Sequence, residues 1–349
     1  IQNKVVLITG AGGSIGSEIS RQVAKNKAKK VILLDSNEFG LYSIKNEIEN
    51  FATETELFTV LTSVNNQKRM IEVMEAFKVD TIYHTAAYKH VPLVEENPFE
   101  AVINNILGTK TCVDSAIKAG VETFVLISTD KAVRPTNIMG ATKRFAELIL
   151  QSVPKEIKTK MIMVRFGNVI GSSGSAIPLF QQQIKEGGPV TVTHPEVIRY
   201  FMSIPEAAEL VIQAGAMGVG GDVFVLDMGE PVKIYELAKR LINLSGMELK
   251  DDLNPEGEIE IIFTGLRRGE KLFEELLIGD NVSTTEHKQI LRAEEDCLSA
   301  KELERYIDLV KKAEISRDLV GLKEIFKQVV MGFAPEEEIL DIVHQQSKE

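Results

Sequence analysis

The sequence contains only two cysteines, Cys112 and Cys297, which excludes a disulfide-rich framework. Neither cysteine has a partner at the spacing of metal ligands, and no cluster of histidine, cysteine and aspartate indicates a bound metal. Both cysteines lie in segments with a helical or near-helical pattern, where we expect free, buried thiols. This usage of cysteine is typical of a protein in a reducing cytosol.

Long apolar runs are also missing, so no segment of about 18 residues is expected to span a bilayer, and no signal peptide precedes the first predicted strand. Basic residues are in deficit, because 40 Lys and Arg stand against 51 Asp and Glu, a formal net charge of −11. Such a charge repels polyphosphate chains, and we expect neither a nucleic-acid partner nor direct membrane contact. The first strand begins close to Ile1, which is not Met, so we expect this chain to be a piece of a longer protein.

The first half of the chain alternates short β-branched runs with helical patterns. We expect strands at Val5–Thr9, Val31–Asp35, Leu57–Leu61, Thr81–His84, Thr123–Ile127 and Met161–Arg165. We expect helices at Ser14–Lys25, Asn37–Asn50, Asn66–Phe77, Pro98–Ala119 and Met139–Gln151. This alternation predicts an α/β fold, a Rossmann-type doubly wound parallel sheet whose ligand cleft lies beyond the carboxyl ends of the strands.

After Asn168 this alternation gives way to loops rich in glycine, serine and proline, which predicts a smaller lobe. Val223–Leu226 has the pattern of another sheet strand, so we expect the lobe to interleave with the sheet. We predict a first domain over 1–167 with a strand returning near 223–226, a second lobe mainly over 168–298, and C-terminal helices over 299–349. Ser299 and Glu302 form a capping-box pattern, and a further helix is expected around Leu319–Val330.

A glycine-rich turn, Thr9-Gly10-Ala11-Gly12-Gly13-Ser14-Ile15-Gly16, joins a predicted strand to a predicted helix. Gly10 permits a tight turn, Gly13 lets the backbone approach a pyrophosphate, and Gly16 allows helix and strand to pack closely. The start of the helix, with Ser14 and Ile15, presents amide groups to the anion. Such turns also occur for packing alone, but their position here predicts a dinucleotide site.

Asp35 ends the second predicted strand, 19 residues after Gly16, where a carboxylate accepts hydrogen bonds from an adenosine ribose. It would repel a ribose 2′-phosphate, and no Arg or Lys follows in Ser36-Asn37-Glu38. NAD is therefore favoured over NADP. The alternative is that Asp35 caps the next helix, and one carboxylate can do both.

The fifth predicted strand leads into Ser128-Thr129-Asp130-Lys131, and a helix follows with Met139 and Lys143 four residues apart. This spacing places positions 139 and 143 on one helix face, toward the cofactor. Met139 cannot give or take a proton, so the site is either degenerate or uses other groups for acid–base chemistry. An acid beside a base at the end of a strand favours the second interpretation over a solvated surface pair.

At these residues the chain resembles the extended short-chain dehydrogenases, which carry a Ser or Thr at the strand end and Tyr-x-x-x-Lys on the next helix. It is most similar to the bacterial UDP-N-acetylglucosamine 4,6-dehydratases of the large membrane-anchored kind, in which Met replaces Tyr. The resemblance covers nearly the whole chain. It rests on TGAGGSIGSE (9–18), AAYKHVPLVEENP (86–98), NNILGT (104–109), STDKAVRPTNIMGATKR (128–144), VRFGNVIGSSGS (164–175), RYFMSIPEA (199–207) and GLRRGEKLFEELL (265–277).

The resemblance implies an internal redox cycle in which NAD takes a hydride from carbon 4 of the sugar and returns it to carbon 6 after water is lost. It implies Lys131 as the base at carbon 5, Asp130 as the acid at the 6-hydroxyl, Thr129 orienting the 4-hydroxyl and Lys143 holding the nicotinamide ribose. As a base, Lys131 needs a pKa well below its usual value of about 10.4. Direct pairing with Asp130 opposes this, so we expect the closed complex to separate the two side chains.

The resemblance also implies binding residues and an assembly. The further cofactor residues are Ser63, Ala86, Ala87, Lys89, Asn105 and Ser128, and the substrate residues are Lys89, His90, Asn168, Arg199, Arg267 and Glu270, with Arg268 and Lys271 in the same cluster. For single residues among these, a structural histidine or a solvated surface charge is the alternative. NAD would bind to 1–167 and a UDP-sugar mainly to 168–298.

The helices Pro98–Ala119 and Met139–Gln151 resemble those that pair in the dimers of the family, so we expect a homo-oligomer. The resemblance further implies a cytoplasmic domain at the inner face of the bacterial inner membrane, held by a membrane region that precedes this chain. Three functions stay open: a retaining dehydratase, an epimerase or inverting dehydratase on the same substrate, and a non-catalytic NAD-binding module.

Overall fold

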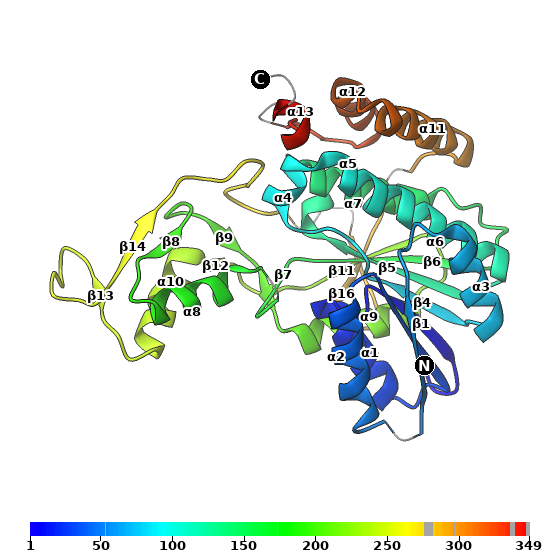
Figure 1. The fold of residues 1–349 in the computed structure, drawn as a ribbon, viewed down its shortest axis with the longest axis horizontal. Helices are drawn as coiled ribbons and strands as arrows, with labels where there is room; N and C mark the ends of the chain where they lie inside the picture. Colours follow the sequence, from blue (N-terminus) through cyan, green and yellow to red (C-terminus); the bar gives the residue numbers. More distant parts are fainter. Residues whose placement is uncertain (53, 173, 276–281, 296, 336–338, 347–349) are drawn as a thin grey trace.

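The computed structural model describes residues 1–349 except 53, 173, 276–281, 296, 336–338 and 347–349. Figure 1 shows a central sheet between two layers of helices, a smaller lobe beside it, and C-terminal helices packed over α5 and α7. The six strands expected in the first half are present, with ends that differ from the prediction by no more than one or two residues.

The central sheet has the strand order β15-β16-β11-β6-β5-β4-β1-β2-β3. Its strands are β1 Val5–Thr9, β2 Lys30–Asp35, β3 Glu56–Leu61, β4 Thr81–His84, β5 Thr123–Thr129, β6 Lys160–Phe166, β11 Asp222–Leu226, β15 Val282–Thr284 and β16 Ile290–Ala293. From β3 to β11 all neighbours are parallel, whereas β16 and β15 are antiparallel additions. The strand order reverses at β1 and β4, which places a ligand crevice at their carboxyl ends.

Helices cover both faces because successive side chains of a strand point to opposite sides. In β1, Val6 and Ile8 pack against α1 Ser14–Lys25, α2 Glu38–Glu49 and α9 Ile204–Met217. Val5 and Leu7 belong to the other core, with α3 Gln67–Phe77, α6 Gly108–Ala119 and α7 Ile138–Gln151. The prediction of a doubly wound sheet is therefore confirmed.

The helix expected over Pro98–Ala119 is interrupted. It consists of α5 Pro98–Ala101, a π-helical segment Val102–Leu107, and α6. A short helix that the sequence pattern did not predict, α4 Val91–Glu96, precedes it. π-Turns are frequent at functional sites, and this one carries the buried Asn105.

The smaller lobe has a hydrophobic core of its own, with Phe180, Val192, Ile242 and Ile259 at its centre. It contains α8 Ala176–Lys185, β8 Val190–Val192, α10 Ile234–Leu244, β13 Leu249–Lys250 and β14 Ile259–Phe263. Two short ribbons connect it to the sheet domain: β7 Asn168–Val169 pairs with β10 Phe201–Met202, and β9 Ile198–Arg199 pairs with β12 Val232–Lys233. Between α9 and β12 the chain passes through the sheet as β11, the strand that the pattern at Val223–Leu226 predicted, so elements of the lobe precede and follow β11 in the sequence.

The C-terminal helices are α11 Ala300–Ser316, α12 Leu319–Val329 and α13 Ile342–Gln346. The predicted capping box is present, since Ser299 and Glu302 bond reciprocally at the start of α11. Helices α11 and α12 share one apolar core with α7, in which the Phe145 and Phe326 rings lie 6.3 Å apart.

The side chains of α7 from Ile138 to Leu150 are all buried. This helix, which resembles a pairing helix of the family's dimers, therefore has no exposed face over that range for a second chain. The chain's own helices α11 and α12 pack against α7. Pairing between chains stays a prediction.

Cys112 is buried as expected, but Cys297 is exposed, because it lies in the surface connection between β16 and α11. Within the described ranges, no helix has both the length and the apolar character needed to cross a membrane. The same residues include no group of three or more His, Cys, Asp or Glu side chains arranged to hold a metal ion.

Candidate active site

A cleft of about 420 Å³ lies at the carboxyl ends of the parallel strands, where the reversal of strand order predicts it. Its walls come from the turn between β1 and α1, the loop after β4, the end of β5, one face of α7, the segment after β6 and residues 267–270 with Glu274. The sheet domain and the smaller lobe therefore both contribute side chains.

The glycine-rich turn forms one end of the cleft and has little space for side chains. Gly10 has φ +70°, and a Cβ atom on it would lie 2.7 Å from the Ala86 amide nitrogen. A Cβ atom on Gly16 would collide with the Gly10 carbonyl oxygen. Gly13 is the N-cap of α1 and no side chain caps the helix there, so the positive end of the helix dipole meets the cleft. This arrangement suits a pyrophosphate.

Asp35 supports that turn from the end of β2. Its Oδ2 accepts a hydrogen bond from the Gly12 amide at 2.8 Å, and its Oδ1 accepts one from the Asn37 amide at 2.9 Å. The cap of α2 is Asn37, whose side chain accepts from the Gly40 amide. Asp35 thus fixes the glycine turn rather than capping α2 itself, and a carboxylate oxygen can accept a further hydrogen bond from a ribose.

Most of the predicted cofactor residues line the cleft, and four do not. Those at the cleft are Gly10, Gly13, Ser14, Ile15, Gly16, Ala87, Lys89, Ser128 and Lys143. Asp35, Ser63 and Ala86 lie outside its lining, as does Asn105. Asn105 is buried and holds the loop after β4 in place. Its Oδ1 accepts from the Tyr88 amide, and its Nδ2 donates to the Tyr88 carbonyl and to the Thr142 hydroxyl. It supports the wall of the cleft from behind.

Met139 and Lys143 both line the cleft from α7, as their spacing predicts. Lys143 Nζ donates to the Ile127 carbonyl at 2.7 Å. Burial lowers the pKa of Lys143 to about 8, although the Glu147 carboxylate opposes the shift. Met139 is buried and offers no group that exchanges a proton.

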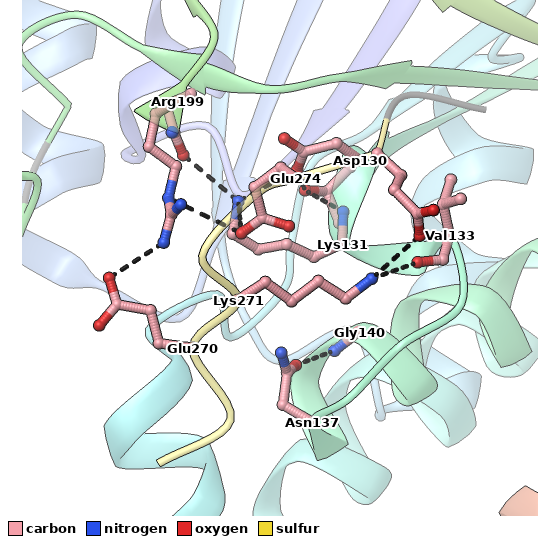
Figure 2. A network of polar contacts seen from close by, with 12 residues as sticks. Asp130, Lys131, Val133, Asn137, Gly140, Arg199, Glu270, Lys271 and Glu274 are labelled. Carbon is pink, nitrogen blue, oxygen red and sulfur yellow. Dashed lines mark hydrogen bonds and ion pairs between the residues drawn. The ribbon is translucent and has the colours of Figure 1, made fainter. Parts of the chain in front are cut away.

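The Asp130–Lys131 pair closes β5, and Figure 2 shows the two side chains beside one another. Asp130 Oδ1 accepts from the Thr129 hydroxyl at 2.8 Å and from Lys131 Nζ at 3.1 Å. Asp130 Oδ2 is buried, and no described residue forms a hydrogen bond with it. Thr129 and Lys131 line the cleft, whereas the Asp130 side chain lies fully buried behind them.

Lys131 also contacts residues that come from the smaller lobe and its connections. Its Nζ donates to Asn168 Oδ1 at 3.3 Å and lies 3.5 Å from Glu274 Oε1. Burial lowers the pKa of Lys131, but the Asp130 and Glu274 carboxylates outweigh it, so the pKa lies above its ordinary value. Asp130 and Lys131 are in contact in this structure. It therefore does not have the separation of the two side chains that we expect in a closed complex.

The predicted substrate residues all line the cleft: Lys89, His90, Asn168, Arg199, Arg267 and Glu270. Arg199 Nη2 donates to Glu270 Oε1 at 3.0 Å, and Glu270 Oε2 accepts from the Arg267 amide at 3.1 Å. Desolvation and the nearby Lys131 ammonium lower the pKa of Lys89. These cations suit a diphosphate.

The segment that carries Arg267 and Glu270 is anchored to the loop after β5. Asn137 Nδ2 donates to the Gly269 carbonyl at 2.9 Å. Lys271 Nζ donates to the Val133 carbonyl at 3.1 Å, a contact that is drawn in Figure 2. The motif 265–277 is described only as far as Glu275, and its last two residues lie outside the described ranges. The sequence analysis did not select Asn137 or Glu274, which also line the cleft.

The doubly wound sheet, the glycine turn and the cleft define a Rossmann-type α/β protein. The chain belongs to the family described as "Polysaccharide biosynthesis protein", whose model matches residues 6–295. It is 57% identical over 279 residues to the capsular polysaccharide biosynthesis protein CapD of Staphylococcus aureus. That match covers 79% of this chain and 45% of CapD, so the chain spans less than half the length of this relative.

Solved structures share the fold. The X-ray structure of Pen from Bacillus thuringiensis matches with a TM-score of 0.75 and 32% identity, over 88% of this chain and 97% of Pen. The dTDP-glucose 4,6-dehydratase DesIV from Streptomyces venezuelae, solved with NAD and DAU bound, matches with a TM-score of 0.68 and 22% identity, over 78% of this chain and 87% of DesIV. At that identity, the match to DesIV shows the fold alone.

Proposed function

We propose that this chain catalyses the NAD-dependent 4,6-dehydration of UDP-N-acetylglucosamine, with retention at carbon 5, in bacterial polysaccharide biosynthesis. The product is a UDP-2-acetamido-2,6-dideoxy-hexos-4-ulose. The observation that carries the proposal is the Asp130–Lys131 pair at the end of β5, next to a cleft in which Met139 stands where a proton-transferring Tyr would be expected. A site with an acid and a base but no such Tyr suits elimination of water better than simple hydride transfer.

The cleft suits NAD as the cofactor. Gly10 and Gly16 let the turn and α1 pack closely, and Gly13 at the start of α1 lets the backbone approach a pyrophosphate. Asp35 disfavours a 2′-phosphate beside the adenosine ribose. Lys143 lies on the same wall, where its ammonium can donate to the nicotinamide ribose. When bound, NAD supplies the hydride acceptor for carbon 4 of the sugar and the donor for carbon 6.

The protein supplies the proton transfers. A 4-keto group acidifies the proton on carbon 5, which Lys131 removes, while Asp130 protonates the departing 6-hydroxyl. The Thr129 hydroxyl, which donates to Asp130, is placed to orient the 4-hydroxyl, whose proton passes to the Asp130 carboxylate, directly or through a water, as the hydride leaves carbon 4. Asp130 then gives this proton to the departing 6-hydroxyl, and Lys131 returns its proton to carbon 5 as the hydride reaches carbon 6. Because Lys131 must be neutral to act as a base, its pairing with Asp130 has to weaken before the proton on carbon 5 is removed.

The smaller lobe would hold the UDP moiety. Arg199, Arg267 and Lys89 provide cations for the diphosphate, and Glu270 provides a carboxylate for ribose hydroxyls. Attachment at the inner face of the inner membrane, through a segment outside this chain, belongs to the same proposal. It rests on the resemblance to the membrane-anchored dehydratases and on the greater length of CapD.

The test is to incubate the protein with UDP-N-acetylglucosamine, without added reductant, and to analyse the nucleotide sugar by mass spectrometry. We expect a product lighter by one water. The Lys131→Ala variant is expected to bind NAD and to form no product. If no UDP-sugar changes mass, the alternative of a non-catalytic NAD-binding module is supported instead.

An epimerase or an inverting dehydratase is the second candidate. An epimerase leaves the mass unchanged, and Met139 disfavours it because nothing at that position can carry the 4-hydroxyl proton. Solvent deuterium incorporated at carbon 5, followed by NMR of the coupling constants, distinguishes retention from inversion in the dehydrated product.

A further inference from the structure

Glu274 lies beside the acid–base pair, although it is far from that pair in the sequence. We propose that Glu274 is a positioning residue, which holds the Lys131 ammonium in the cleft and sets the pH at which Lys131 releases its proton. This inference rests on the proposed function, in which Lys131 is the base.

The geometry places the Glu274 carboxylate between two cations. Its Oε1 lies 3.5 Å from Lys131 Nζ and 3.8 Å from Arg199 Nε. Figure 2 shows the three side chains together. The Glu274 side chain is only 4% exposed, yet the residue lines the cleft. A buried carboxylate needs opposite charges close by, and within the described part of the chain Lys131 and Arg199 are its ion-pair partners.

Lys131 faces charged groups from four elements. Asp130 lies on its own turn, Glu274 on the segment before β15, Arg199 on β9 and Lys89 in the loop after β4. Arg199 and Lys89 repel the Lys131 ammonium, whereas Asp130 and Glu274 attract it. Without Glu274, Asp130 would be the remaining ion-pair partner of Lys131 among the described residues, while Arg199 keeps its pair with Glu270. Glu274 therefore contributes a large part of the attraction that keeps the ammonium at its position.

The proposed reaction makes this second carboxylate necessary. Asp130 has to be protonated before it can give a proton to the 6-hydroxyl, and a neutral Asp130 no longer attracts the Lys131 ammonium. Glu274 is then the carboxylate that still pairs with Lys131. It keeps the Lys131 side chain directed into the cleft while the charge on Asp130 changes.

The position of Glu274 is coupled to the substrate side of the cleft. The Leu272 carbonyl, two residues before Glu274, accepts from the Ile198 amide at 3.2 Å and from Arg199 Nη1 at 3.3 Å. The same segment carries Arg267 and Glu270, which are proposed to bind UDP. A UDP-sugar that engages those residues can therefore alter the distance between Glu274 and Lys131.

The experiment measures the proton affinity of Lys131 directly. The whole chain is treated with a trace of isotopically labelled acetic anhydride at a series of pH values, and the modification of Lys131 is quantified by peptide mass spectrometry. A deprotonated amine reacts and an ammonium does not. We compare the wild type with Glu274→Gln and with Glu275→Gln, a neighbouring carboxylate that is more exposed and pairs with Arg134 and Lys271.

For Glu274→Gln we expect the Lys131 labelling curve to move to lower pH, with several-fold more modification near neutral pH, because an attracting charge is lost. Glu275→Gln should follow the wild-type curve. An unchanged curve in Glu274→Gln would overturn the proposal. Thermal unfolding shows whether each variant is folded. Should Glu274→Gln fail to fold, Glu274→Asp is the second variant, because it retains the charge at a greater distance from Lys131. A Lys131 labelling curve of Glu274→Asp that overlays the wild-type curve would also overturn the proposal.

A second readout concerns turnover. If Lys131 is the base, the acidic limb of the pH profile of kcat should move to lower pH in Glu274→Gln, together with the labelling curve. If the wild type forms no dehydrated product, the proposed function fails while the labelling result still decides the role of Glu274. The two failures are therefore distinguishable.

Discussion

Arg165 and Glu147 form a buried, bidentate ion pair next to the proposed active site. Arg165 Nε donates to Glu147 Oε1 at 2.7 Å, and Arg165 Nη2 pairs with Oε2, with both side chains fully inaccessible to solvent. Arg144 and Glu295 complete the cluster, so two positive and two negative charges balance. The cluster connects α7, β6 and the segment after β16, and Glu147 lies one helical turn from Lys143.

Replacing Glu147 by Gln should destabilise the fold, because Arg165 then remains buried with half of its charge compensation. We expect a loss of about 3–5 kcal/mol in the free energy of unfolding, as for the breaking of other buried pairs. Urea denaturation at pH 7 measures it. Glu72→Gln, in an exposed pair with Arg69, serves as the control and should change stability by less than about 0.5 kcal/mol.

The same pair predicts a pH dependence. Burial raises the pKa of Glu147, but the Arg165 guanidinium outweighs it and the pKa falls to about 2 from its usual value of 4.5. Since the folded pKa is the lower one, the stabilisation is complete above pH 4.5 and is lost as the pH falls toward 2. The stability difference between wild type and Glu147→Gln should therefore shrink over that range. A constant difference would contradict the assignment.

The cover that the C-terminal helices provide for α7 predicts a second stability effect. Phe326 on α12 is fully buried between Phe145 and Phe333. Phe326→Ala should cost about 3–5 kcal/mol, the usual range for removing a buried aromatic ring. Val320→Ala, at a 75% exposed position on the same helix, is the control and should be nearly neutral. Equal effects of the two changes on thermal unfolding would argue against the packing described here.

Gly167 is expected to be essential for the position of Asp130. A Cβ atom at Gly167 would lie 3.0 Å from Asp130 Oδ2, the buried oxygen without a partner, and 3.4 Å from Met228 Cε. Gly167→Ala should therefore lower kcat several-fold while NAD binding is unchanged. Gly120→Ala is the control, since it introduces strain at φ +71° without meeting any atom within 4 Å. It should cost about 1 kcal/mol in stability and leave kcat unchanged.

Asp35 is expected to control the choice of dinucleotide. Asp35→Ala removes the acceptor for the Gly12 and Asn37 amides as well as the charge that opposes a 2′-phosphate. NAD affinity should fall by at least about tenfold, as for loss of a charged hydrogen bond, and the preference over NADP should weaken. Titration with both dinucleotides measures this. Glu38→Ala, at the exposed start of α2, should bind them as the wild type does.

Met139 is expected to act through its shape alone. Met139→Leu conserves volume and should keep kcat within a few-fold of the wild type, because neither side chain transfers a proton. Met139→Ala opens space beside Lys143 and should raise the KM for the sugar more than it lowers kcat. A large loss of kcat in Met139→Leu would show that the sulfur atom has a chemical role.

Much of the site was predictable because its signals are local in sequence. The glycines of the first turn, Asp35 at a strand end, and the spacing of Met139 and Lys143 each report a backbone geometry that a few neighbouring residues enforce. The alternation of strand and helix patterns likewise indicated the parallel sheet. The hydrophobic period of a strand and that of a helix both repeat within a dozen residues, so a short stretch of sequence is enough to recognise each. The capping box at Ser299 belongs to the same class of signal.

Tertiary structure alone decided the rest. Glu274 reaches Lys131 only because the chain returns from the smaller lobe, and no periodicity connects positions so far apart. The same applies to the burial of α7 beneath α11 and α12, and to the exposure of Cys297. The sequence by itself indicated the residues to which we assign the proposed chemistry. Packing between distant segments decided which charges surround Lys131, because electrostatic interaction depends on distance in space rather than along the chain.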